Sequence, residues 1–284
     1  MGKALSRLQR IGQDLVIPDL EDRMRRLPHR AGEFGVDEFG FDPKVARQAV
    51  LAAAWIYRYW FRAEAHGVAR VPPGRVLLIA NHSGQVPIDG LIIGIALFLE
   101  AEPPRLVRAM VERWAQTLPF VSEFFVRCGQ VLGVPENCRR LLENEEAILV
   151  FPEGARGISK TIDSAYKLTE FGLGFMRLAL ETRTPIVPIA VVGGEEQYVS
   201  VADVKPLARL LGMPAFPIVP QMLIPIVGML PLPVKYHVYF GEPMTFTGDP
   251  DDEDSVIEEK VWVVKSTIQS MINRGLKERR GLFR

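Results

Sequence analysis

Residues 76–89 read VLLIANHSGQVPID and residues 147–156 read AILVFPEGAR, and the two stretches share one pattern. Each begins with five apolar residues and then turns abruptly polar. Such a short apolar run is typical of a strand buried on both faces of a parallel sheet, and residues 186–192, IVPIAVV, form a third one. The alternation of these runs with helical patterns predicts an α/β fold with a largely parallel central sheet flanked by helices. The expected helices are Asp89–Glu100, Glu136–Glu145 and Ser164–Thr182.

The two ends of the chain add an N-terminal helical segment and a C-terminal helix. Asp42 is a capping residue type and Pro43 suits the first helical position, so we expect an amphipathic helix over residues 43–66. Lys235–Phe240 alternates like a further strand, and Asp249–Arg280 has the acidic start and basic end that a helix dipole favours. The predicted organisation is a lead-in over residues 1–42 and a single domain over residues 43–284.

The composition restricts the class of protein. The 284 residues carry 34 basic and 34 acidic side chains, a balance that argues against a nucleic-acid-binding protein, which usually carries a basic field. Residues 1–30 lack the apolar stretch of roughly 7–15 residues that a signal peptide requires. Two cysteines, Cys128 and Cys138, fit a reducing compartment. We therefore expect no signal peptide and a location on the cytoplasmic side.

One segment, residues 210–234, carries no charge, and Gln221 is its only polar side chain. It is long enough to span a bilayer as a helix. Its six prolines exclude a straight transmembrane helix, because an interior proline removes a backbone donor and costs a helix about 3 kcal/mol. Since irregular backbone is not tolerated in the hydrocarbon region, we expect an apolar flap that lies on the membrane surface. The predicted association is peripheral or monotopic, without a transmembrane helix.

Aromatic side chains crowd beside Arg58 and Arg62 over residues 55–62, WIYRYWFR, at the end of the expected N-terminal helix. This mixture suits a lipid headgroup interface, where amphipathic rings and guanidinium groups are favoured. It equally suits a helix that packs on the core. The sequence leaves both interpretations open.

His82 follows directly after the buried-strand pattern of residues 76–80. Ligands of open α/β sheets bind beyond the carboxyl ends of the strands. A histidine can transfer a proton near neutral pH, and a carboxylate on its second ring nitrogen fixes the tautomer. His82 with Asp89 is therefore a candidate base and orienting pair, whereas the alternative is a loop histidine followed by a helix cap.

A second strand pattern ends in Glu153, Gly154 and Arg156. The glycine permits a tight turn, and the opposite charges are suited to binding polar groups at the sheet edge. Taken alone, the same residues also describe a charged turn with a surface ion pair. The two strand ends together favour a site.

Asn81-His82 with Asp89, followed by Phe151–Arg156, resembles the signature blocks of the glycerolipid acyltransferase family, of 1-acylglycerol-3-phosphate acyltransferase type. Gly129–Gly133 and Val187–Ile189 resemble two weaker blocks of that family. The resemblance implies transfer of a fatty acyl group from acyl-CoA or acyl carrier protein to a lipid hydroxyl, with no cofactor. No set of His, Cys and Asp residues has the spacing of metal ligands, so we expect no metal ion. The resemblance also implies that His82 is the general base and Asp89 its partner, and that the acceptor site includes Asn81, Ser83, Gly84, Glu153, Gly154 and Arg156.

Two departures from the family pattern concern the acceptor. Six residues separate His82 from Asp89, which is a longer gap than the family usually has. Pro135 stands about where members that accept a phosphate carry an arginine, so Arg139 and Arg140 are the candidates for phosphate contacts. The proline-rich segment resembles the branch related to diacylglycerol acyltransferases and phytyl ester synthases. We therefore rank a neutral lipid alcohol slightly above a lysophospholipid as acceptor.

Two other functions compete with this one. Gly154–Thr161 differs by one residue from a phosphate-binding P-loop, but Ser159 replaces the second glycine and Glu153 adds a carboxylate beside it. The second alternative is a non-catalytic protein that binds lipid or a membrane surface and has a degenerate acyltransferase site. Loss of acyl transfer in a His82 variant distinguishes an enzyme from such a protein.

Overall fold

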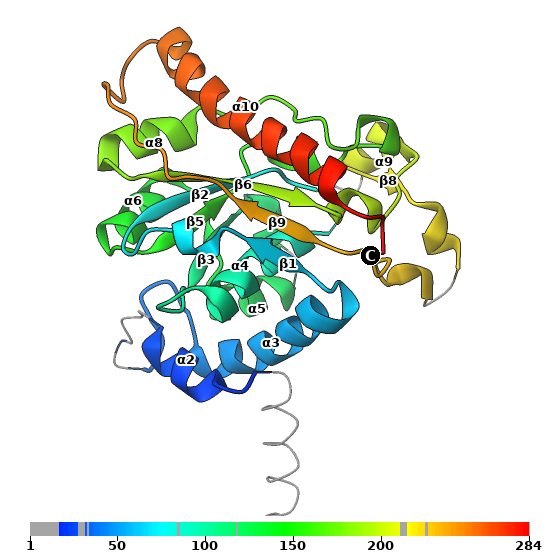
Figure 1. The fold of residues 1–284 in the computed structure, drawn as a ribbon, viewed down its shortest axis with the longest axis horizontal. Coiled ribbons are helices and arrows are strands. Elements are labelled where there is room, and N and C mark those ends of the chain that lie inside the picture. The colour runs from blue at the N-terminus through cyan, green and yellow to red at the C-terminus, as the bar shows by residue number, and fades with distance from the viewer. Residues whose placement is uncertain are drawn as a thin grey trace, which may run out of the picture.

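A computed structural model describes residues 17–27, 32, 34–83, 86–117, 119–210, 215–224 and 227–283. Its centre is a seven-stranded sheet in the order β1-β9-β6-β2-β5-β3-β4 (Figure 1). All neighbouring strands are parallel except β6 and β9. This confirms the predicted α/β fold with a largely parallel sheet. The strands are β1 Glu64–His66, β2 Val76–Ala80, β3 Val107–Val111, β4 Val131–Leu132, β5 Ala147–Val150, β6 Ile186–Val192 and β9 His237–Phe240.

Helices cover both faces of the sheet (Figure 1). Buried side chains of α2, α3 and α4 form one core on one face, and those of α6, α8 and α10 form a second core on the other. The helices are α2 Leu20–Arg26, α3 Pro43–Trp55, α4 Ile88–Glu100, α5 Val121–Arg127, α6 Pro135–Glu143, α7 Ala155–Ile158, α8 Gly174–Thr182, α9 Lys205–Leu210 and α10 Asp254–Glu278. The expected C-terminal helix over Asp249–Arg280 is α10, and the expected strand over Lys235–Phe240 contains β9.

The side chains of β2 are apolar on both faces of the sheet, and each face packs against one of the two cores. Successive side chains of a strand point to opposite faces. Val76, Leu78 and Ala80 accordingly enter the first core, whereas Leu77 and Ile79 enter the second, and all five are fully buried. A continuous apolar run is therefore the sequence of a central strand covered on both sides.

The N-terminal helix ends earlier than the predicted residue 66. Asp42 caps α3 as expected, through hydrogen bonds from the backbone N–H groups of residues 44 and 45. The helix continues as a π-helical turn, η1 Ile56–Trp60, and residues 64–66 form strand β1. Arg62 adopts a left-handed conformation with φ +46°, which stops the helix and turns the chain into the sheet.

The aromatic end of this helix packs partly on the core, and its contact with a lipid headgroup interface stays a prediction. Tyr57 and Phe61 are buried in the core, whereas Trp55 and Tyr59 are about half exposed. The indole of Trp60 donates a hydrogen bond of 3.2 Å to the carbonyl of Pro231. The helix end is therefore packed on the core and tied to the proline-rich segment.

The helix expected over Ser164–Thr182 begins ten residues late, at Gly174. The residues before Gly174 form a loop whose backbone makes hydrogen bonds to side chains of other segments. The backbone N–H of Thr169 donates to a carboxylate oxygen of Glu153 at 2.8 Å, and that of Leu168 donates to the side chain of Gln269 at 3.1 Å. A helix over these residues would use both donors internally.

Part of the expected lead-in, residues 1–42, packs against the domain. Leu20 and Met24 of α2 are buried in the first core. Arg23 of the same helix donates to the carbonyl of Phe98 at 3.2 Å, at the end of α4. Residues 1–16 lie outside the described part of the chain. The domain therefore begins before residue 43.

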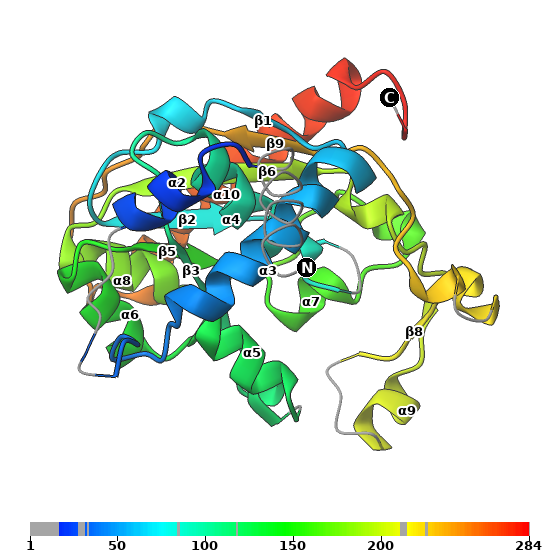
Figure 2. The same ribbon diagram turned by 90° about the horizontal axis from the view of Figure 1, so that it is seen from below.

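The proline-rich flap, residues 210–234, consists of short pieces where it is described. Strand β8 Pro217–Ile218 pairs with β7 Ala202–Asp203, and the 3₁₀ turns η6 Pro220–Leu223 and η7 Val227–Met229 follow. Figure 2 shows this segment extending away from the sheet. Across the described ranges, no helix has both the length and the apolar character needed to cross a membrane.

Candidate active site

Three strands end at one edge of the sheet. Because β2 is parallel to its neighbours β5 and β6, the residues that follow these three strands come together. They are Asn81–Ser83 after β2, Pro152–Glu153 after β5 and Gly193–Glu195 after β6. The two polar strand ends selected from the sequence therefore belong to one site.

His82 and Asp89 form a close pair. Nδ1 of His82 lies 2.7 Å from Oδ2 of Asp89. The carboxylate is fully buried and also accepts the backbone N–H groups of Ser83 and Gly90, both at 2.8 Å. The six-residue gap thus closes by placing Asp89 in the first turn of α4. Since the carboxylate engages Nδ1, Nε2 is the nitrogen suited to accept a proton.

The surroundings of His82 fix its position from two further sides. Its backbone N–H donates to Oε1 of Glu153 at 3.0 Å. Its ring stacks on Phe151, with the centroids 4.2 Å apart and the planes 19° from parallel. The side chain is 12% exposed, so most of it is covered by these neighbours. Such preorganisation is what a general base requires.

Asn81 and Ser83 flank His82 and are both buried. The side chain of Asn81 donates to the carbonyl of Val191 at 3.1 Å and accepts its N–H at 2.7 Å, which ties the end of β2 to β6. Oγ of Ser83 is buried without a hydrogen-bond partner among the described residues. Gly84, the other predicted substrate-binding residue here, lies outside the described residues.

Glu153 is a buried structural carboxylate in this geometry. Its Oε1 accepts from the His82 backbone, and its Oε2 accepts from Thr169 and lies 2.9 Å from Nζ of Lys160. Lys160 is itself buried and lies 3.3 Å from Oε1 of Glu195. Burial raises the pKa of Glu195 to about 7. Glu153, Lys160 and Glu195 thus form a buried cluster that holds the loop of His82 through the hydrogen bond from the His82 backbone.

Gly154 and Arg156 lie at the start of α7. Gly154 adopts φ +56°, which favours glycine, and a Cβ there would lie 3.0 Å from a carboxylate oxygen of Glu112. Arg156 is exposed and pairs with Glu170 at 3.3 Å. Its predicted contact with the acceptor stays a prediction, and the side chain is on the rim of the site.

Arg139 and Arg140 are not brought to the site. Both lie on α6, where Arg139 pairs with Glu136 and Glu181 at 2.8 Å each, and Arg140 pairs with Glu38. Arg140 lines a cavity of about 660 Å³ with Glu146, which precedes β5, whereas His82 lies where the strands end. This placement does not support the predicted phosphate contacts.

Sequence reasoning missed Lys160 and Glu195. In the sequence Lys160 matches only the P-loop alternative. In the structure its ammonium group is buried between two carboxylates, so it cannot bind a phosphate as that motif requires. Glu195 follows the third apolar strand at the same sheet edge. A polar residue after an apolar strand was the available signal. The sequence alone does not show that this strand, β6, lies beside β2, so Glu195 could not be assigned to the site.

Comparison with known proteins identifies the family. A family model described as Acyltransferase matches residues 62–192, which span β1 to β6 and include His82, Asp89 and Glu153. Uncharacterized proteins of Mycobacterium tuberculosis and Mycobacterium leprae are 38% identical over 261 residues, or 89% of this chain and 72% and 71% of those proteins. The chain belongs to the acyltransferase family. The acyltransferase resemblance drawn from Asn81-His82 and Phe151–Arg156 is thereby confirmed.

More distant relatives of this acyltransferase have a described activity. A "DGAT1/2-independent enzyme synthesizing storage lipids" of Gallus gallus is 24% identical over 78% of this chain and 62% of that enzyme. The 1-acyl-sn-glycerophosphate (LPA) acyltransferase PlsC of Thermotoga maritima aligns over 99% of this acyltransferase and 100% of that chain, with a TM-score of 0.51 and 16% identity. The second match shows a shared fold. The family makes the chain an acyltransferase.

Proposed function

We propose that this acyltransferase moves a fatty acyl group from an acyl thioester, acyl-CoA or acyl carrier protein, to the hydroxyl of a lipid at a membrane surface. The observation that carries the proposal is the 2.7 Å contact between His82 Nδ1 and the buried Asp89 carboxylate. It orients the imidazole and leaves Nε2 as the nitrogen that can act as the base.

The proposed reaction uses this geometry. Nε2 of His82 takes the proton from the acceptor hydroxyl as its oxygen attacks the thioester carbonyl. Asp89 stabilises the imidazolium that forms. The carbon–sulfur bond then breaks, the thiol leaves with the proton that His82 held, and the ester is the product. Because the thioester is already activated, the protein needs no covalent nucleophile.

A neutral lipid alcohol is the acceptor class that the residues favour over a lysophospholipid. The two arginines predicted to contact a phosphate, Arg139 and Arg140, are engaged by carboxylates on α6. Pro135 is the first residue of that helix and offers no charge. The relative that synthesises storage lipids points the same way.

An acceptor panel tests the proposal. Purified protein receives one long-chain acyl-CoA, and in parallel an acyl carrier protein thioester, with lysophosphatidic acid, monoacylglycerol, diacylglycerol or a long-chain alcohol. Release of the free thiol together with formation of a neutral ester is the expected result. Thiol release with lysophosphatidic acid alone would contradict the acceptor class. Lipid binding without thiol release for any acceptor would favour the non-catalytic alternative.

The membrane contact is proposed to lie on the flap and at the start of helix α5. Leu210 is 81% exposed, Leu223 84% and Phe120 88%, which is unusual for large apolar side chains in water. In Figure 2, α5 and α9 project from the same side of the molecule. Burying such side chains contributes about 25 cal/mol for each Å² removed from water, so a non-spanning flap can anchor the protein.

We expect the double variant Leu223→Ser/Ile224→Ser to bind phosphatidylcholine vesicles at least about tenfold more weakly than the wild type. Each fully buried leucine or isoleucine contributes about 1.5–3 kcal/mol, and about 1.4 kcal/mol corresponds to a tenfold change. Both side chains are more than half exposed, so the melting temperature should not change. The measurement is cosedimentation with vesicles.

Trp262→Ser is the matched control, because Trp262 is an exposed apolar side chain on α10 that belongs neither to the flap nor to α5. It should bind vesicles like the wild type. Equal binding by the flap variant and the wild type, or release of the wild type by mild salt alone, would contradict the apolar flap as the anchor.

A further inference from the structure

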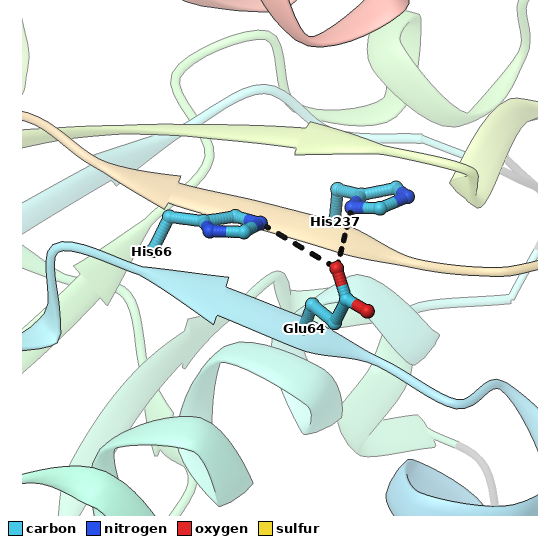
Figure 3. Close-up of side chains that lie close together, drawn as sticks. All are labelled: Glu64, His66 and His237. Atoms are coloured by element: carbon cyan, nitrogen blue, oxygen red, sulfur yellow. Dashed lines mark ion pairs between the residues drawn. The ribbon is translucent and has the colours of Figure 1, made fainter. Parts of the chain in front are cut away.

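Three potential metal ligands meet on strand β1, at one edge of the sheet, and on its neighbour β9. Glu64 and His66 lie on β1, and His237 lies opposite Glu64 on the parallel neighbour β9. Residues two apart on a strand share a face. Figure 3 shows both imidazoles pointing one nitrogen toward the same carboxylate oxygen of Glu64. The candidate ligand atoms of the three side chains all lie within 4.8 Å of one another.

His237 provides the second observation. Its side chain is nine-tenths buried, and neither ring nitrogen has a hydrogen-bond partner among the described residues. Buried polar atoms are normally satisfied, because an unpaired one costs about 1–3 kcal/mol. The nearest candidate is Oε2 of Glu64, 3.5 Å from Nδ1.

We propose that Glu64, His66 and His237 bind a Zn²⁺ ion. Two imidazoles and one carboxylate are a ligand set that zinc prefers, with water as the fourth ligand, whereas Mg²⁺ and Ca²⁺ require mainly oxygen ligands. With zinc–ligand bonds of about 2.0–2.2 Å, ligand atoms of a tetrahedral site lie roughly 3.3 Å apart.

The present distances are close to this geometry. Oε2 of Glu64 lies 3.5 Å from His237 Nδ1 and 3.9 Å from His66 Nε2. The His66 side chain is 46% exposed and has room to approach. Its ring already stacks on Tyr239 at 4.8 Å, which holds it on the required face of β1.

The charge at the site includes one competing cation. Nζ of Lys235 lies 2.6 Å from Oε1 of Glu64. Lys235 occupies the oxygen that faces away from the imidazoles, and Oε2 is left for the ion. The positive charge nearby should weaken the affinity without removing the site.

The consequence of binding is a cross-link between β1 and β9. Strand β1 is only three residues long, is an edge strand, and connects the aromatic end of α3 to the sheet. A bound ion would hold β1 against β9, because its ligands come from both strands. The site shares no residue with His82 and Asp89, so it is independent of the proposed acyl transfer.

The test uses the full-length chain, freed of metal with a chelator and titrated with ZnCl₂ in a calorimeter. The wild type should bind one ion, and its melting temperature should rise with zinc, because a ligand of the folded state stabilises it. His66→Ala and Glu64→Gln should each weaken binding by more than about tenfold, since even loss of a neighbouring group costs about 10–100-fold. Both side chains are about half exposed, so the variants should fold.

Glu242→Gln is the matched control, because it removes an exposed carboxylate just beyond β9 that pairs with Arg70. It should bind zinc like the wild type. No zinc binding by the wild type would overturn the proposal. Equal binding by wild type and His66→Ala would overturn it as well, since it would place the ion elsewhere, for example at Cys128 or Cys138.

Discussion

Replacing His82 with alanine is expected to lower kcat/KM for acyl transfer by about 10²–10⁴-fold, the usual contribution of a general base. The side chain is held by Asp89 through Nδ1 and by the ring of Phe151, so its loss removes a base that is already positioned. Free thiol release with the best acceptor of the panel measures the effect. Vesicle binding should be unchanged, because His82 is not part of the exposed apolar surface.

Asp89→Asn tests whether His82 needs the carboxylate on Nδ1 to act as a base, because the imidazole itself stays in place. An amide at this position can donate to Nδ1, which would leave the proton on Nε2 and remove the base. A large loss of kcat with little change in KM is therefore expected in this variant too. Thiol release by His82→Ala at the wild-type rate, in protein that melts like the wild type, would contradict the catalytic assignment.

The sequence predicted the sheet best where a strand is apolar on both faces. Strands β2, β5 and β6 were predicted within a residue of their ends. Strand β3 was missed because Arg108 interrupts its apolar run. That guanidinium is 1% exposed and is neutralised by Asp37, from the predicted lead-in, and by Glu146. A buried charge of this kind depends on partners that are distant in the chain, which no local pattern contains.

The site was predictable where it follows a strand directly and was missed where it depends on neighbouring strands. His82 and Glu153 come straight after β2 and β5, but the spacing did not show that Asp89 reaches His82. Lys160 looked like part of a phosphate loop, because its two carboxylate partners come from different segments. The ligands His66 and His237 are brought together only by the pairing of β1 with β9.

Lys160→Met is expected to destabilise the folded protein by about 3–5 kcal/mol at pH 8, the cost of breaking a buried ion pair from one side. Methionine keeps the length of the side chain but leaves Glu153 and Glu195 buried without their shared cation. Denaturant unfolding of the wild type and the variant measures the difference. Arg156→Met, which removes an exposed cation of the neighbouring helix, should cost at most about 1 kcal/mol.

The pH dependence of this loss distinguishes a buried charge from lost packing. Burial already raises the pKa of Glu195 to about 7, and Lys160 opposes that rise. Without the lysine the folded state binds a proton more tightly than the unfolded state, so stability is present at low pH and lost as pH rises through the folded pKa. The destabilisation by Lys160→Met should therefore be smaller at pH 5.5 than at pH 8. An equal loss at both pH values would mean that Lys160 acts through packing alone.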